Sequence, residues 1–169
     1  MSGIRRFWRH LVTDHGSARR AFPRPVLDRI ETAIASGETT HRGQVRVVIE
    51  AALPLARVMA GVSPRERALE VFGLTRTWDT EENCGVLLYV LLADRDVEIV
   101  ADRGIHARVG DTTWEAVCRQ VEAAFRERRF AEGAKAGVTE VNALIARHFP
   151  RAPGETARRN ELPDRPLLI

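Results

Sequence analysis

An unbroken run of apolar residues from Val86 to Ala93 dominates the hydropathy pattern of the chain. A polar Asp94-Arg95-Asp96 segment follows it, and a second, shorter apolar run extends to Ala101. A long run rich in Val and Leu and bounded by turn residues is typical of a central strand buried on both faces. The polar break is short enough to predict an antiparallel hairpin, with Asp94 and Asp96 as turn formers. A hairpin brings its two ends together, so Asn83 is expected to lie beside Asp102.

The periodicity outside this hairpin predicts helices before and after it. The segment Ser63-Pro64-Arg65-Glu66 predicts a helix start, because it offers an N-cap serine, a proline at the first helical position and a glutamate that closes a capping box. That helix would join two strands as a crossover, so those strands should be parallel. The other predicted elements are a helix at 26–36, a strand at 44–53, a long helix capped by Asp111 or Thr112, and a helix at 131–149. This order predicts an α/β fold, a three-layer α/β/α sandwich with a small mixed sheet flanked by helices.

The first 16 residues predict a short amphipathic helix with a basic side. Two interpretations stay open: an interfacial helix on an anionic membrane surface, or a helix docked on its own domain or on a partner subunit. Trp8, Trp78 and Trp114 are all expected to be packing residues. The apolar face of the helix would carry Ile4, Phe7, Trp8, Leu11 and Val12.

Three segments follow from these patterns. Residues 1–25 form the basic amphipathic helix and a linker, residues 26–150 form the α/β/α domain, and residues 151–169 form a tail that contains prolines and no periodicity. The apolar end of the tail, at 167–169, is expected to lie on the surface.

The composition of the chain argues against two classes of protein, nucleic-acid-binding proteins and transmembrane proteins. The 169 residues carry a formal net charge of +3, and arginine supplies nearly all of the positive charge, since Lys135 is the only lysine. No nucleic-acid-binding motif is recognisable, so a nucleic-acid partner is not expected. Cys84 and Cys118 are far apart and are expected to be buried, reduced thiols. No apolar run approaches the roughly 20 residues of a transmembrane helix, and no signal peptide is recognisable, which predicts a cytoplasmic protein, peripheral to the membrane at most.

Two stretches of the sequence resemble the core signature of the TPM domain family. The first is Asn83-Cys84-Gly85-Val86-Leu87-Leu88, and the second runs from Val97 to Ile105 and contains Asp102-Arg103-Gly104. The closing pattern Phe125 … Arg129-Phe130 … Glu132-Gly133 is also similar, so the resemblance covers about 26–149. It implies a three-layer α/β/α sandwich. The family includes a plant thylakoid-lumen acid phosphatase, proteins linked to photosystem repair and many bacterial proteins, and some of its domains bind calcium or other divalent ions.

The chain departs from the family pattern at three positions. Cys84 stands where asparagine is usual, Asp102 where the family often has the first glycine of Gly-x-Gly, and His106 where a glutamate is common. The chain is therefore similar to a cytosolic bacterial branch that carries the Asp-Arg-Gly version. The resemblance implies weak phosphatase or metal-binding behaviour and fixes no substrate.

The predicted topology places a set of polar residues at the open end of the hairpin. Oxygen ligands in such a cluster suit Ca²⁺ or Mg²⁺, and an arginine beside them suits a phosphate ester. The opposing interpretation is that these residues are solvated loop positions, that the histidines are structural, and that Arg103 pairs with Asp102. The metal-ligand candidates are Asn83, Asp102, Glu82 and Asp79, and the anion-binding candidates are Arg103, His41 and His106.

These patterns support three hypotheses of function and assign no catalytic residue. The preferred one is a TPM-like domain that binds a divalent metal or an anion, with weak phosphatase activity at most. The alternative is a non-enzymatic accessory module that docks on a membrane surface or a membrane-associated protein through its N-terminal helix. A phosphomonoesterase ranks third. The Ser-His-Asp arrangement, the Walker loop and the phosphate-cradling loop of a cysteine phosphatase are not visible in the sequence.

Overall fold

The predicted hairpin forms and lies within a mixed sheet. In this computed structural model, which describes residues 3–155 and 160–169, β2 (Gly85–Leu91) pairs antiparallel with β3 (Asp96–Ala101). β1 (Gln44–Glu50) pairs parallel with β2, and the described strands have the order β3-β2-β1-β4. Every residue of β1 and β2 is buried, as expected for strands covered on both faces.

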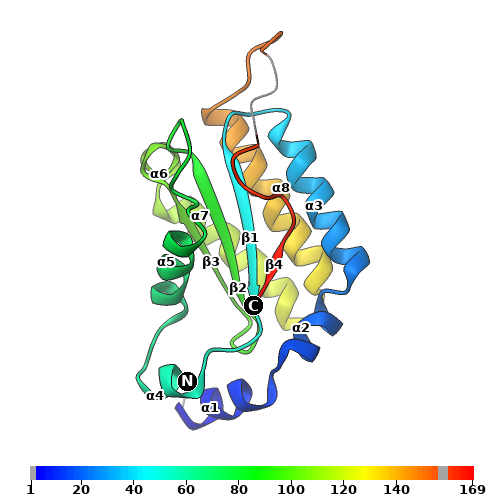
Figure 1. Ribbon diagram of the computed structural model, residues 1–169, viewed down its shortest axis with the longest axis vertical. Helices are drawn as coiled ribbons and strands as arrows, with labels where there is room; N and C mark the ends of the chain where they lie inside the picture. Colours follow the sequence, from blue (N-terminus) through cyan, green and yellow to red (C-terminus); the bar gives the residue numbers. More distant parts are fainter. Residues whose placement is uncertain (1–2, 156–159) are drawn as a thin grey trace.

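Helices cover both faces of the sheet (Figure 1). α3 (Arg24–Glu38), α7 (Asp111–Arg126) and α8 (Phe130–His148) pack on one face, and α5 (Pro64–Leu74) covers the other. Side chains alternate between the two cores, because successive strand residues point to opposite faces. Val86 and Leu88 belong to the core under α3, α7 and α8, whereas Leu87 and Tyr89 belong to the core under α5. The fold is thus the predicted three-layer α/β/α sandwich.

Of the two helix N-caps predicted from the sequence, one is correct and one is wrong. The capping box of α5 forms: the Glu66 N–H donates to Ser63 Oγ (3.1 Å), and the Ser63 N–H donates to Glu66 Oε2 (2.7 Å). The predicted cap of α7 by Asp111 or Thr112 is wrong. Gly110 is the N-cap, with φ 81° and no side-chain hydrogen bond, because the short helix α6 (Arg103–Val109) ends directly before it.

The N-terminal segment contains two helices where the pattern predicts one. α1 (Gly3–Val12) ends before Asp14, whose carboxylate caps α2 (His15–Ala21) by accepting the Ser17 N–H at 2.7 Å. α1 packs against another short helix, α4 (Leu55–Met59), which follows β1. Residues 1–2 of the predicted N-terminal segment lie outside the described residues.

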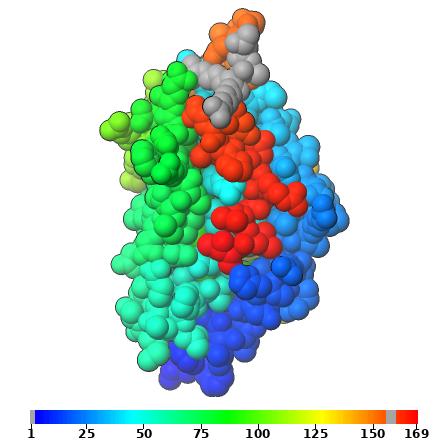
Figure 2. Space-filling view, viewed as in Figure 1, coloured from blue at the N-terminus to red at the C-terminus, as the bar shows by residue number. Residues whose placement is uncertain are grey.

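The C-terminal tail is tied to the sheet. Its last apolar residues form β4 (Leu167–Leu168), which pairs parallel with β1. The Arg46 Nη1 donates to the carbonyls of Pro163 (2.7 Å) and Arg165 (2.8 Å), and Figure 2 shows this part of the chain, in red, lying between α3 and the green segment that contains α5. The tail lies on the surface through 167–169, as predicted. The sequence does not predict that these residues pair with β1. Residues 156–159 of the tail lie outside the described part.

Candidate functional site at the open end of the hairpin

The two open ends of the hairpin meet. The Asp102 N–H donates to the Gly85 carbonyl at 2.8 Å, which extends the ladder by one residue beyond the strands. Asn83 has a left-handed backbone (φ 52°), and its carbonyl accepts the N–H groups of Gly104 (3.0 Å) and Ile105 (3.3 Å). The loop before β2 is therefore joined to the first turn of α6. A Cβ on Gly104 would lie 2.5 Å from the Asn83 carbonyl oxygen, so this close approach requires glycine.

Asp102 combines a structural hydrogen bond with a free acceptor. It is the N-cap of α6, and its Oδ1 accepts the Arg103 N–H at 2.7 Å. The residue is 9 % exposed, and its Oδ2 is buried without a hydrogen-bond partner. A buried acceptor with no partner costs free energy, so a ligand that contacted Oδ2 would remove that cost.

Two arginines at this end form contacts with the loop residues that precede β2. The Arg103 Nε donates to Asn83 Oδ1 at 3.3 Å, and the Arg42 Nη1 forms an ion pair with Glu82 Oε1 at 3.2 Å. Asn83, Glu82, Asp102 and Arg103 are thus neighbours, as the topology predicts. Both guanidinium groups and both side-chain oxygens are partly exposed, so all four can exchange their present partners for a ligand.

Cys84 lies at the open end of the hairpin, but its thiol is not reactive. Its Sγ donates to the Arg42 carbonyl at 3.5 Å, and the residue is fully buried. Burial, followed by the nearby Glu82 carboxylate, raises the pKa of the thiol to about 12. A thiol with that pKa is protonated at neutral pH, which excludes it as a nucleophile in this state.

The His41 side chain is buried and takes part in a hydrogen-bond network in the protein interior. Its Nε2 lies 2.9 Å from Asn142 Oδ1 on α8, and the Asn142 Nδ2 donates to the Ala33 carbonyl on α3. Burial lowers the pKa of His41, which keeps the ring neutral. His41 therefore links α8 to the start of β1, and the geometry gives it no contact with Asp102.

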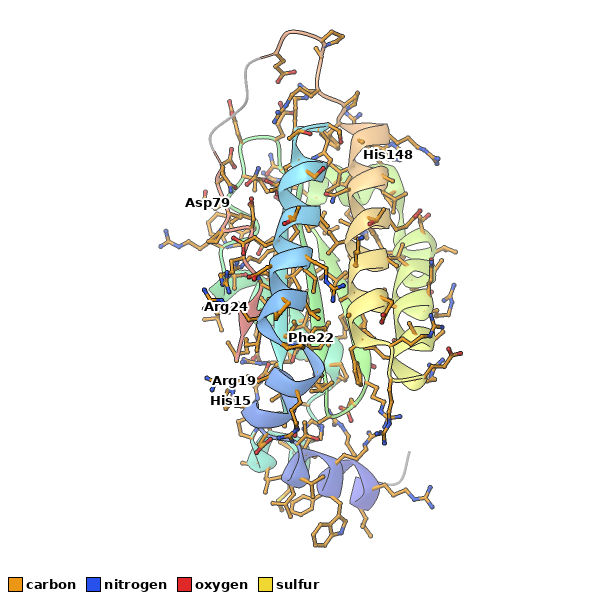
Figure 3. The ribbon with its side chains drawn as sticks, turned by 90° about the vertical axis from the view of Figure 1, so that its right-hand side faces the viewer. His15, Arg19, Phe22, Arg24, Asp79 and His148 are labelled. Atoms are coloured by element: carbon orange, nitrogen blue, oxygen red, sulfur yellow. The ribbon has the colours of Figure 1, made fainter. Side chains whose placement is uncertain are left out.

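Asp79 and His106 also have surroundings of their own. Asp79 is exposed in the loop before β2 (Figure 3), and its backbone N–H donates to the Arg76 carbonyl. The His106 Nε2 lies 3.6 Å from Asp111 Oδ1, at the start of α7. Within residues 3–155 and 160–169, no group of three or more His, Cys, Asp or Glu side chains is arranged to hold a metal ion.

Two residues at this end are not among the ligand candidates predicted from the sequence. Arg42 is brought there because β1 runs parallel to β2, a signal that the topology does contain. Glu161 arrives from the tail, where its Oε2 accepts the Glu81 N–H at 3.1 Å. No periodicity in the tail could have placed Glu161 there.

Comparison with known proteins identifies the family. The family model described as TPM domain matches residues 21–144. The chain belongs to the TPM domain family. None of the curated proteins matches it.

Two solved structures share the fold of this TPM domain. The BA42 protein from the psychrophilic bacterium Bizionia argentinensis has a TM-score of 0.72 at 25 % identity, and the match covers 85 % of this chain and 92 % of that one. The N-terminal domain of a protein from P. gingivalis has a TM-score of 0.50 at 21 % identity, covering 75 % and 76 % of the two chains. None of the helices in the described part of this TPM domain is long and apolar enough to span a bilayer.

A groove of about 380 Å³ lies beside the edge strand β3 of the TPM domain. Trp114 forms part of its lining, with an indole N–H that is buried and has no hydrogen-bond partner. Arg65, from α5, also lines the groove and donates to the Ile99 carbonyl at 2.6 Å and to Glu98 Oε2 at 3.3 Å. The arginine thereby covers part of the otherwise open strand edge.

The carboxyl of Asp96, at the start of β3, should make stability depend on pH. Burial, reinforced by Glu98 and Glu122, raises its pKa from 3.8 to about 7. The folded chain keeps this proton to higher pH than the unfolded chain does, so stability falls as pH rises between these two values. We expect Asp96→Asn to raise the free energy of unfolding by about 1–2 kcal/mol at about pH 8 and to change it little near pH 4. Urea denaturation across this range measures the effect, and parallel profiles for the two proteins would contradict it.

Proposed function

We propose that this TPM domain binds a hydrated divalent cation together with an anion at the open end of the hairpin, with Asp102 as the anchoring ligand. The observation that carries the proposal is the buried Asp102 Oδ2, which has no hydrogen-bond partner. The oxygens of Asn83 and Glu82 lie on the adjoining loop and would complete the protein's share of the ligands. Because the protein supplies few oxygens, the site suits Mg²⁺, which keeps several of its waters, better than Ca²⁺, which takes 6–8 oxygen ligands.

The arginines at the same end suit an anion. Arg42 and Arg103 would bind phosphate oxygens once they leave Glu82 and Asn83, because a guanidinium group matches two oxygens of a phosphate at once. A bound cation would polarise a phosphate oxygen and acidify its own water. Cys84 and His41 both have partners elsewhere, so neither would act as the nucleophile, and any hydrolysis of a phosphomonoester at this end should be slow.

A thermal-melt titration tests the proposal. The probes are magnesium, calcium and manganese chlorides and inorganic phosphate, each at millimolar concentration, because a ligand that binds only the folded state raises the melting temperature. We expect the largest rise with magnesium and phosphate together and its loss in Asp102→Asn. Asparagine is also a good N-cap, so this variant removes the charge while retaining the cap of α6.

Asp14→Asn provides the matched control, because Asp14 is also an N-cap aspartate but lies at the start of α2. It should respond to magnesium and phosphate as the wild type does. The same three proteins should show slow, magnesium-dependent hydrolysis of p-nitrophenyl phosphate only where Asp102 is present. An equal melting-temperature rise in wild type and Asp102→Asn would refute the site.

A further inference from the structure

Helix α1 docks on the domain through its polar side. The Arg6 Nε lies 2.8 Å from Asp94 Oδ2, and the Arg9 Nη2 lies 2.6 Å from Asp94 Oδ1. The His10 ring is fully buried, with Nε2 3.2 Å from Asp94 Oδ2 and Nδ1 accepting the Leu53 N–H at 3.0 Å. These contacts fix how the helix is rotated about its axis. An amphipathic helix usually buries its apolar stripe against the core, and α1 does the reverse.

The apolar side of α1 consequently faces solvent. Ile4, Trp8 and Leu11 recur at helical spacing on the side opposite Arg6 and Arg9, and they are 71 %, 57 % and 48 % exposed. Val12 is 70 % exposed, and Met59 on the neighbouring helix α4 is 77 % exposed. We call Ile4, Trp8, Leu11, Val12 and Met59 the apolar end face. A cluster of large exposed apolar side chains, held in place by a buried ion pair, is typical of an interaction surface.

The charge around the apolar end face is positive. Residues 3–13 and 51–62 contain four arginines and neither aspartate nor glutamate. Asp94 and Glu70 pair with arginines from these segments, whereas Arg5 is exposed beside the apolar stripe. An anionic surface would therefore meet apolar side chains together with the cationic Arg5, and the first acidic residue after α1 is Asp14, the N-cap of α2.

We propose that α1 and α4 dock this domain on the surface of an anionic lipid bilayer. α1 lies crosswise at one end of the elongated molecule, so its whole length can rest on a flat surface (Figures 1 and 3). Trp8 and the aliphatic side chains would enter the headgroup region, and Arg5 would remain at the lipid phosphates, which is the arrangement of interfacial amphipathic helices. This inference does not depend on the cation site proposed above.

Docking in this orientation would hold the opposite end of the molecule away from the lipid. Asp94 marks the closed end of the hairpin, next to α1, and Asn83 and Asp102 mark its open end. A strand of the length of β2 spans roughly 20–25 Å. The open end would therefore face the aqueous phase, accessible to soluble ligands.

Vesicle co-sedimentation of the full chain tests the proposal. The vesicles are phosphatidylcholine alone and an equimolar mixture of phosphatidylcholine and phosphatidylglycerol. The double variant Trp8→Gln/Leu11→Gln removes two exposed apolar side chains, and Trp78→Gln/Leu74→Gln is the matched control, because Trp78 and Leu74 are 51 % and 75 % exposed outside the apolar end face. Circular dichroism of both double variants checks that they are folded.

We expect the wild type and the control to bind the anionic vesicles, with weaker binding to phosphatidylcholine and in high salt. The Trp8→Gln/Leu11→Gln variant should bind about tenfold more weakly or worse. Absence of wild-type binding to anionic vesicles, or an equal loss in both double variants, would overturn the proposal. So would a stable dimer in sedimentation velocity without lipid that dissociates only in Trp8→Gln/Leu11→Gln, because a second copy would then cover this face.

Discussion

Replacing Asp94 with alanine is expected to lower the free energy of unfolding by about 3–5 kcal/mol. The Asp94 side chain is 4 % exposed and is the shared acceptor of Arg6, Arg9 and His10. Burial acts to raise the pKa of Asp94, but the hydrogen bonds from His10 and Arg6 outweigh burial, and the pKa is lowered overall. The carboxylate is thus stabilised by the folded state. Removing it leaves two partly buried arginines without their counter-charge and the buried His10 ring without its neighbouring acceptor, which costs more than the ion pairs themselves contribute.

Urea denaturation of Asp94→Ala and Asp28→Ala separates this effect from the loss of an ordinary ion pair. Asp28 also pairs with an arginine, Arg165 at 3.4 Å, but its side chain is 53 % exposed. Exposed pairs contribute little, so Asp28→Ala should cost less than about 1 kcal/mol. The Asp94 carboxylate stabilises the fold above its unfolded pKa of 3.8, so the difference between wild type and Asp94→Ala should shrink as pH falls through that region. Similar losses in the two variants at neutral pH would contradict the buried-anion interpretation.

The cluster of Asp94 with Arg6, Arg9 and His10 also shows what sequence patterns cannot predict. The polar segment between the two apolar runs correctly predicts a turn, because turn chemistry is local. The turn covers residues 92–95, so Asp94 lies within it, whereas Asp96, predicted as a turn former, is the first residue of β3. The same residues cannot reveal that Asp94 anchors a helix more than 80 positions away in the chain. The amphipathic pattern of α1 correctly predicts a helix with two sides, but which side faces the domain depends on what lies opposite. An apolar stripe predicts burial only when another apolar surface meets it. Trp8 is exposed for this reason. Trp78 is also exposed, in the turn after α5, so the packing roles that the sequence predicts for these two tryptophans are wrong.

Strong, continuous local signals account for the parts of the fold that the sequence does predict. The run from Val86 to Ala93 can be satisfied only by burial on both faces, which requires covering layers and so implies the sandwich. The box Ser63–Glu66 satisfies backbone groups within four residues, and it therefore survives any tertiary arrangement. α6 and β4 escape prediction because seven and two residues are too short for a period to appear.

The candidate site shows the same difference between what local signals predict and what tertiary packing decides. Hairpin geometry alone brings Asn83 to Asp102, because strand ends that pair must be adjacent. The side-chain partners of His41 and His106 depend on helices that pack from elsewhere, and chain order does not encode these contacts. Topology therefore predicts which residues share an end of the sheet, whereas it does not predict which of them are available to a ligand. The unpaired Asp102 Oδ2 is a property of the packed structure alone.

Replacing Gly85 with alanine is expected to destabilise the domain by about 3 kcal/mol or more. A Cβ at this position would lie 1.8 Å from the Thr77 carbonyl oxygen, and Thr77 is itself fully buried. The obstacle is backbone and not the end of a flexible side chain, so the loop before β2 would have to move. Since the Gly85 carbonyl accepts the Asp102 N–H, that movement should also displace Asp102 and abolish the magnesium- and phosphate-dependent rise in melting temperature.

Gly73→Ala is the matched control for this substitution. Gly73 lies within α5, and a Cβ there would meet nothing within 4 Å. Alanine has the higher helix propensity, so this variant should be unchanged or more stable by up to about 1 kcal/mol. Thermal and urea denaturation of the two variants measure the difference directly. If Gly85→Ala unfolds at the same urea concentration as Gly73→Ala, the result would contradict the close packing of the loop against β2. The close packing also explains why glycine at position 85, and not the apolar run alone, determines how the open end of the hairpin is shaped.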